Sequence, residues 1–248
     1  MTSTQRSSLS LRQLSYKMLA FLVSVVLIGA LMAPFVPVTR VLAENSSSKR
    51  SSVTDEPELT EATAAIVTDS QGNVLWSKNP DQELPMASIT KVMTAIVALD
   101  SGIDLDKPCE ITAPDLEEGS QLAGLTSADT PTLRQLLMMM LVYSANDAAY
   151  NIAVNVSGSE QAFVDQMNKK AEEIGMTHTH FQNPHGLDAD GHHSTARDLA
   201  LMGRYAREHY PLIASAVHTR SYTTTVGGEQ RTFHSTDDLM DTYRGLLG

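Results

Sequence analysis

The chain has 248 residues, of which 42% are apolar, and its formal net charge at pH 7 is −11. That apolar content is ordinary for a globular protein, and the acidic balance argues against nucleic-acid binding and against electrostatic attachment to anionic lipid. Cys109 is the only cysteine, which excludes an intrachain disulfide; we expect a plain buried or half-buried thiol there.

Residues 1–43 have the layout of a secretory signal peptide. Basic residues precede an apolar run from Met18 to Val36, and the small residue Ala43 stands at the expected cleavage site. Because the run is long enough to approach a membrane span, an uncleaved N-terminal anchor is the alternative. Both alternatives export the remainder, in which residues 44–61 form a flexible linker and residues 62–248 the functional domain.

Hydrophobic periodicity and turn residues predict the elements of this domain in chain order. They are a β-hairpin over 64–76, a helix from Ser88 up to Gly102, a loop region over 101–131, helices over 132–143, 147–156, 160–174 and 196–208, and a second hairpin over 220–233. Helices fill the middle and hairpins flank them, which predicts an α+β fold and not a doubly wound sheet.

The last residues, 243–248, are apolar and strand-like. Domains seldom finish in an exposed apolar element, because such an edge invites association. We therefore expect a truncated record or a fragment.

The string Ser88-Ile89-Thr90-Lys91 opens the first predicted helix and places a hydroxyl and an amine three residues apart on one face. A serine hydroxyl needs a nearby base to act as a nucleophile, and burial at a helix start lowers the pKa of a lysine toward the neutral amine. The alternative without a catalytic role is a surface lysine one turn from a capping serine.

The string Ser144-Ala145-Asn146 lies where one predicted helix breaks before the next begins. Side chains at such a break can point into a cleft, although serine, asparagine and aspartate are also ordinary N-cap residues. We expect Asp147 to be the cap, which leaves Ser144 free to relay a proton and Asn146 free to hold a substrate amide.

These strings, together with Asn183-Pro184-His185-Gly186-Leu187 and Ser194-Thr195-Ala196, resemble the serine-type D-alanyl-D-alanine carboxypeptidases of peptidase family S11, the low-molecular-mass penicillin-binding proteins. The likeness covers about residues 62–248. It implies a β-lactamase/transpeptidase-like fold in which a helical region packs on an antiparallel sheet, incomplete here at the C-terminus.

The resemblance also implies a function in cell-wall biogenesis. Ser88 would attack the penultimate D-Ala carbonyl of peptidoglycan stem peptides, release the last D-Ala and form an acyl-enzyme that water hydrolyses. Lys91 would accept the proton of Ser88, and Ser144 with Asn146 would form the second motif. β-Lactams would be inhibitors; no cofactor and no nucleic-acid partner is implied, and contact with the membrane would run only through the N-terminal segment or a missing C-terminal anchor.

One part of the family pattern is missing: the chain contains no Lys-Thr-Gly motif, although Leu246-Leu247-Gly248 resembles its lead-in. The missing strand would bind the substrate carboxylate and complete the oxyanion hole. We therefore expect a polypeptide ending at Gly248 to be inactive and poorly folded.

Three alternatives remain open. A class A-like β-lactamase would share the first string, but it needs a deacylating glutamate on a loop, and Glu160, Glu172 and Glu173 all lie in a predicted helix. A non-catalytic exported module of the same fold and a cross-linking transpeptidase are the others.

Histidines and aspartates of the 178–193 region suggest a metal site, but loop histidines without helical framing are usually structural. We expect no metal site, and we expect His185 to brace the loop around Leu187.

Overall fold

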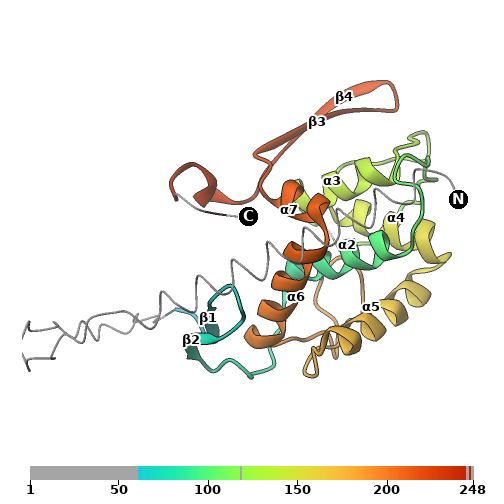
Figure 1. The fold of residues 1–248 in the computed structure, drawn as a ribbon. Coiled ribbons are helices and arrows are strands. Elements are labelled where there is room, and N and C mark those ends of the chain that lie inside the picture. Colours follow the sequence, from blue (N-terminus) through green and yellow to red (C-terminus); the bar gives the residue numbers. More distant parts are fainter. Residues whose placement is uncertain (1–60, 118, 244–245, 247–248) are drawn as a thin grey trace, which may run out of the picture. The chain divides into compact units, whose positions relative to one another are not determined.

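The computed structural model describes residues 61–117, 119–243 and 246. Two antiparallel hairpins flank the helices (Figure 1): β1 (Ala65–Thr68) pairs with β2 (Val74–Lys78), and β3 (Ser221–Val226) pairs with β4 (Glu229–His234). The helices are α2 (Thr90–Asp100), α3 (Leu133–Tyr143), α4 (Asn146–Ser157), α5 (Glu160–Ile174), α6 (Ala196–His209) and α7 (Pro211–Val217), with short 3-10 turns at Ala87–Ile89 and Asp238–Asp241. The α+β prediction is confirmed.

Helix α2 is the central element of the core. It contacts α3, α4, α5 and α6, and its residues Met93, Ala95 and Ile96 have no exposed surface. A helix that is covered on nearly all sides needs apolar or internally bonded residues around its whole circumference. The polar residues of α2 are therefore either functional or bonded within the protein.

The helix ends follow from local sequence. Thr132 caps α3 in a capping box with Gln135, Ser159 caps α5, and Thr195 caps α6. Glycines in the left-handed conformation end α4 at Gly158 and α5 at Gly175.

The C-terminal part contains one helix that the sequence analysis did not predict. Pro211 lies beyond the end of α6 and is the first residue of α7, a position where its missing N–H costs nothing. The end of the chain, residues 243–248, was expected to be strand-like. Tyr243 and Leu246 lie outside any strand, and the other four residues lie outside the described residues. The expectations of a signal peptide over residues 1–43 and of a linker over residues 44–61 concern residues outside the described part, apart from Glu61.

Hairpin β3–β4 is attached to α3 by specific polar and aromatic contacts. Gln135 Nε2 donates to Thr224 Oγ1 at 2.7 Å and to the Thr225 carbonyl at 3.1 Å, while the rings of Tyr143 and Phe233 lie 5.4 Å apart. Because α3 ends at the second motif, the hairpin braces the helix that carries this motif.

Within the described part of the chain, no helix is long and apolar enough to cross a membrane.

Gln135→Ala removes half of the capping box and both bonds to β3. We expect a loss of about 1–2 kcal/mol in the free energy of unfolding, measured by urea denaturation. Gln161→Ala is the matched control, because the Gln161 amide on α5 bonds only the exposed Asp165 carboxylate of its own helix. Equal losses for the two variants would contradict the assigned role of Gln135.

Candidate active site

Ser88 lies in a strained turn immediately before α2. The preceding residue, Ala87, has a φ of 49°, a left-handed conformation that is uncommon for a residue with a side chain. The backbone N–H of Thr90 points to the carbonyls of Ala87 and Ser88 and closes the 3-10 turn. This turn exposes Ser88, whereas Lys91 one turn later is 2% exposed.

Gly186, far along the chain, makes this turn possible. Its φ is +93°, and a Cβ built on it would collide with the carbonyl oxygen of Ala87. The backbone of residues 185–187 therefore packs directly on the backbone of the serine turn, which only glycine permits.

Lys91 Nζ lies 2.9 Å from Ser88 Oγ and donates to the His185 carbonyl at 2.6 Å. Both neighbours are neutral, so no carboxylate compensates for the loss of water around the amine. Burial accordingly lowers the pKa of Lys91 to about 8. At pH 7 about a tenth of the protein then carries an uncharged amine, far more than for an ordinary lysine, within hydrogen-bonding distance of a serine hydroxyl.

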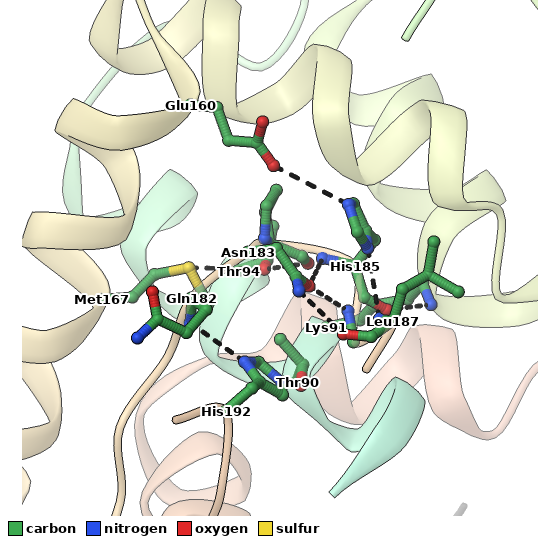
Figure 2. Close-up of polar contacts among 12 residues, drawn as sticks. Thr90, Lys91, Thr94, Glu160, Met167, Gln182, Asn183, His185, Leu187 and His192 are labelled. Carbon is green, nitrogen blue, oxygen red and sulfur yellow. Dashed lines mark hydrogen bonds and ion pairs between the residues drawn. The ribbon is translucent and has the colours of Figure 1, made fainter. Parts of the chain in front are cut away.

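The segment 181–193, here called the strap, supplies the carbonyl that holds Lys91 (Figure 2). Asn183 Oδ1 accepts the N–H groups of His185 and Gly186, and its Nδ2 donates to the Leu187 carbonyl. One asparagine side chain thus folds the strap into a tight turn. Thr94 Oγ1, one turn after Lys91 on α2, donates to the Pro184 carbonyl at 2.6 Å and fixes the turn against the helix.

The His185 ring is neutral and its tautomer follows from its bonds. The Leu187 N–H donates to Nδ1 at 3.2 Å, so the ring proton sits on Nε2, which lies 3.7 Å from a carboxylate oxygen of Glu160. Burial is the main cause that lowers the pKa of His185 to about 4, and the charge of Lys91 adds to it. Burial also raises the pKa of Glu160. The expectation that His185 braces the loop at Leu187 is confirmed.

The second string has the predicted helix break. Ser144 ends α3 with a φ of 64°, Ala145 is the N-cap of α4, and Asn146 is the first residue of that helix. The expectation that Asp147 is the cap is wrong. Asp147 lies in the first turn, where its carboxylate accepts the N–H of Ala148 and also the N–H groups of Ala123 and Leu125 from the preceding loop.

The loop carrying Ala123 and Leu125 is also bonded to the break itself. The Asn146 N–H donates to the Gln121 carbonyl at 2.8 Å, and Gln121 Nε2 donates to the Tyr143 carbonyl at 3.2 Å. The left-handed turn at Ser144 is therefore held from both sides. Among the described residues, the side chains of Ser144 and Asn146 make no hydrogen bond, so their polar groups are available to a ligand.

The structure joins Ser88 and Lys91 directly, whereas Ser144 and Asn146 have no bond to that pair among the described residues. The helix of the first string, α2, packs against both α3 and α4, which flank the second. The sequence reasoning assigned no role to Thr90, Thr94, Asn183 or His192. Thr90 bonds His192 and Thr94 bonds the Pro184 carbonyl, both across the contact between α2 and the strap, and Asn183 bonds within the strap. The available signal was the presence of polar residues in a helix and a loop that both had to be buried.

The remaining reactive groups point to no second site. Cys109 is buried as expected, and burial raises the pKa of its thiol, which disfavours the thiolate. Across the described ranges, no group of three or more histidine, cysteine, aspartate or glutamate side chains is placed to hold a metal ion.

Comparison with known proteins gives a consistent family match. The sequence model of the D-alanyl-D-alanine carboxypeptidases, Peptidase S11, matches residues 50–244. The chain is 34% identical over 187 residues to the D-alanyl-D-alanine carboxypeptidase DacF of Bacillus subtilis, covering 74% of this chain and 46% of DacF. It is 39% identical over 163 residues to a D-alanyl-D-alanine endopeptidase of Pseudomonas aeruginosa, covering 64% of this chain and 51% of that protein.

The fold is similar to that of a solved penicillin-binding protein. The crystal structure of penicillin-binding protein D2 from Listeria monocytogenes in the cefotaxime-bound form superposes with a TM-score of 0.68 and 31% sequence identity, covering 75% of this chain and 77% of that one. The chain spans about half the length of the two curated relatives.

Gly186→Ala tests the packing of the strap on the serine turn. The added methyl group meets the Ala87 carbonyl at a φ that alanine disfavours, so we expect a loss of about 2 kcal/mol or more in unfolding free energy. Gly203→Ala on α6, where nothing lies within 4 Å, is the control and should be neutral or stabilising. The close approach is refuted if Gly186→Ala denatures at the wild-type urea concentration.

The pKa of His185 predicts loss of stability in acid. The folded-state value of about 4 lies below the ordinary 6.5, so the unfolded chain binds the extra proton first as the pH falls. The contribution of neutral His185 to the free energy of unfolding is complete above pH 6.5 and is lost between pH 6.5 and 4. It amounts to roughly 3 kcal/mol. Urea denaturation at several pH values should show a steeper acid decline for wild type and for the exposed control His218→Gln than for His185→Gln. Parallel declines in all three proteins would show that His185 does not cause it.

Proposed function

The chain belongs to the S11 family of D-alanyl-D-alanine carboxypeptidases, and from this premise we propose that it acts as a serine D,D-carboxypeptidase on peptidoglycan stem peptides. The observation that carries the proposal is the Lys91 amine, whose pKa is lowered to about 8, at 2.9 Å from the Ser88 hydroxyl. Such a pair can generate an attacking alkoxide without a metal or an external base.

The first half-reaction is acylation. Neutral Lys91 accepts the proton of Ser88 Oγ as that oxygen attacks the carbonyl carbon of the penultimate D-Ala. The peptide C–N bond breaks, the nitrogen of the last D-Ala takes up a proton, and that residue leaves as the free amino acid. The bond from Lys91 Nζ to the His185 carbonyl supports this role, because it fixes the amine while Ser88 reacts.

The second motif completes the proton path and the substrate contacts. In this proposal Ser144 passes a proton to the leaving nitrogen, and Asn146 bonds an amide of the stem peptide. Water then hydrolyses the ester on Ser88 and restores the hydroxyl. The absence of competing hydrogen bonds to these two side chains among the described residues supports the assignment.

A β-lactamase function is less well supported. In a class A-like β-lactamase, rapid hydrolysis of the penicillin adduct depends on a carboxylate that activates water. Glu160, whose carboxylate lies 3.7 Å from the neutral His185 ring, is the first residue of α5 and not a loop residue. We therefore assign slow release of the adduct, which makes β-lactams inhibitors of this protein. The cefotaxime bound to the similar Listeria protein agrees with that assignment.

Endopeptidase activity is the second candidate function. The relative that is 39% identical to this chain is named a D-alanyl-D-alanine endopeptidase. The same acyl transfer would then cleave a cross-link between two stem peptides. Product analysis by mass spectrometry separates the two: a carboxypeptidase releases D-Ala from a pentapeptide, and an endopeptidase converts a cross-linked dimer into two monomers.

The location of the substrate fits the N-terminal sequence. Peptidoglycan lies outside the cytoplasmic membrane, and residues 1–43 have the pattern of an export signal or an anchor. We propose that the domain works at the extracytoplasmic face of the membrane.

Labelling with a fluorescent penicillin tests the nucleophile. The full-length gene product should form a covalent adduct that persists on a denaturing gel, and Ser88→Ala should abolish it, because Ser88 carries the one hydroxyl that Lys91 Nζ bonds among the described residues. Ser127→Ala, at another exposed serine, should label like wild type. Absence of an adduct on a protein that binds penicillin without hydrolysing it would favour the non-catalytic module, and rapid penicillin hydrolysis would favour the β-lactamase.

The pH dependence of acylation tests the base. Only neutral Lys91 can accept a proton, so the acylation rate should rise about tenfold per pH unit below the pKa and level off above about 8. Lys91→Arg stays charged and should lose at least about 10³-fold in rate. Stopped-flow measurement of penicillin acylation between pH 5.5 and 9 gives the profile; a rate independent of pH in this range would exclude Lys91 as the base.

A further inference from the structure

Thr90 is a polar residue buried without exposed surface between Ser88 and Lys91. Its backbone N–H closes the 3-10 turn by pointing to the carbonyls of Ala87 and Ser88. A displacement of Thr90 would therefore displace the serine turn as well. Its hydroxyl lies 2.8 Å from Nε2 of His192, a residue 102 positions later in the chain (Figure 2).

The direction of this hydrogen bond follows from the other side of the ring. The backbone N–H of Gln182 donates to His192 Nδ1 at 3.0 Å, and a backbone amide can only donate. Nδ1 is therefore unprotonated, the proton of the neutral ring is on Nε2, and Nε2–H donates to Thr90 Oγ1. Burial lowers the pKa of His192, which favours this neutral form.

The ring has little freedom to leave this geometry. His192 is 5% exposed, and the edge of its ring meets the buried ring of Phe181 with centroids 6.0 Å apart and planes at 68°. A second backbone bond, from the His192 N–H to the Ala189 carbonyl, fixes its position in the strap. The imidazole thus fixes the position of the serine turn relative to the strap.

We propose that His192 is a positioning residue that holds the Ser88 turn through the Thr90 hydroxyl. The strap then grips the reacting pair at two points: the His185 carbonyl holds the amine, and the His192 ring holds the turn that carries the hydroxyl. This inference rests on the proposed function. It assigns to His192 a role in keeping Ser88 Oγ and Lys91 Nζ at reacting distance, where a displacement of about 1 Å can cost about 10² in rate.

The Thr90 variants separate positioning from folding. Thr90→Val keeps the shape of the side chain and removes the hydroxyl; we expect a loss of about tenfold or more in the second-order rate of penicillin acylation. Thr90→Ser restores the hydroxyl and should recover most of that rate, although it removes a buried methyl group and is expected to unfold more easily. A purely structural role would give the opposite order, with the less stable serine variant reacting more slowly.

The His192 variants test the other partner. His192→Gln offers an amide N–H to Thr90 and should keep the rate within about threefold, whereas His192→Leu should lose as much as Thr90→Val. In the double variant Thr90→Val/His192→Leu the two losses should not multiply, because both remove one interaction. Thr179→Val is the control: its hydroxyl also bonds near the strap, but to Asp198 and Ser194 of the α6 side, and its acylation rate should equal that of wild type.

Nitrogen NMR of the His192 ring provides a readout that does not depend on catalysis. In the wild-type protein Nδ1 should have the shift of an unprotonated acceptor and Nε2 that of a protonated donor, with a slowly exchanging proton that Thr90→Val makes fast. The opposite tautomer, or a wild-type acylation rate in Thr90→Val, overturns the inference while the proposed function stands. Failure of the wild-type protein to acylate at Ser88 overturns the proposed function instead, and the NMR result still decides whether the bond exists.

Discussion

The buried amine of Lys91 is the constraint on which the other features depend. Removing an ammonium group from water is costly when no opposite charge is nearby. Because the partners of Lys91 are neutral, burial lowers the pKa of its amine to about 8. A carboxylate at the same place would raise the pKa and keep the proton on the amine. The surroundings of Lys91 are neutral for this reason: a serine hydroxyl and a backbone carbonyl are its bonded partners, and the nearby His185 ring is uncharged.

A backbone carbonyl can be offered to a buried amine only if the chain that carries it is held rigidly. The strap meets this need with bonds from its own asparagine, Asn183, and with bonds to two threonines of α2, Thr90 and Thr94. The second motif is built on the same plan, because the loop before α3 fixes the break at Ser144 through backbone groups and the Asp147 carboxylate. In both places a loop from another part of the chain holds a helix start. At the second motif the side chains of Ser144 and Asn146 make no hydrogen bond among the described residues.

Local patterns in the sequence predicted most of the elements, although not α7, and did not predict these contacts. The periodicity of apolar residues and the positions of glycines predicted both hairpins and five helices, and the three-residue spacing predicted the bond between Ser88 and Lys91. The bond from Lys91 to the carbonyl of His185 spans 94 residues and involves a backbone atom, which leaves no trace in residue types. Asp147 was misassigned because an aspartate near a helix start is a good cap, and the buried N–H groups of the 123–125 loop that compete for it appear only in the folded chain.

The contact between Gly186 and Ala87 has a consequence for the order of events during synthesis. The serine turn adopts its left-handed conformation against a stretch of backbone that is translated about a hundred residues later. A nascent chain that has not yet emerged beyond the strap therefore lacks both the Gly186 backbone and the His185 carbonyl. The hydroxyl and the amine acquire these partners only once the strap has been synthesised and has docked on α2.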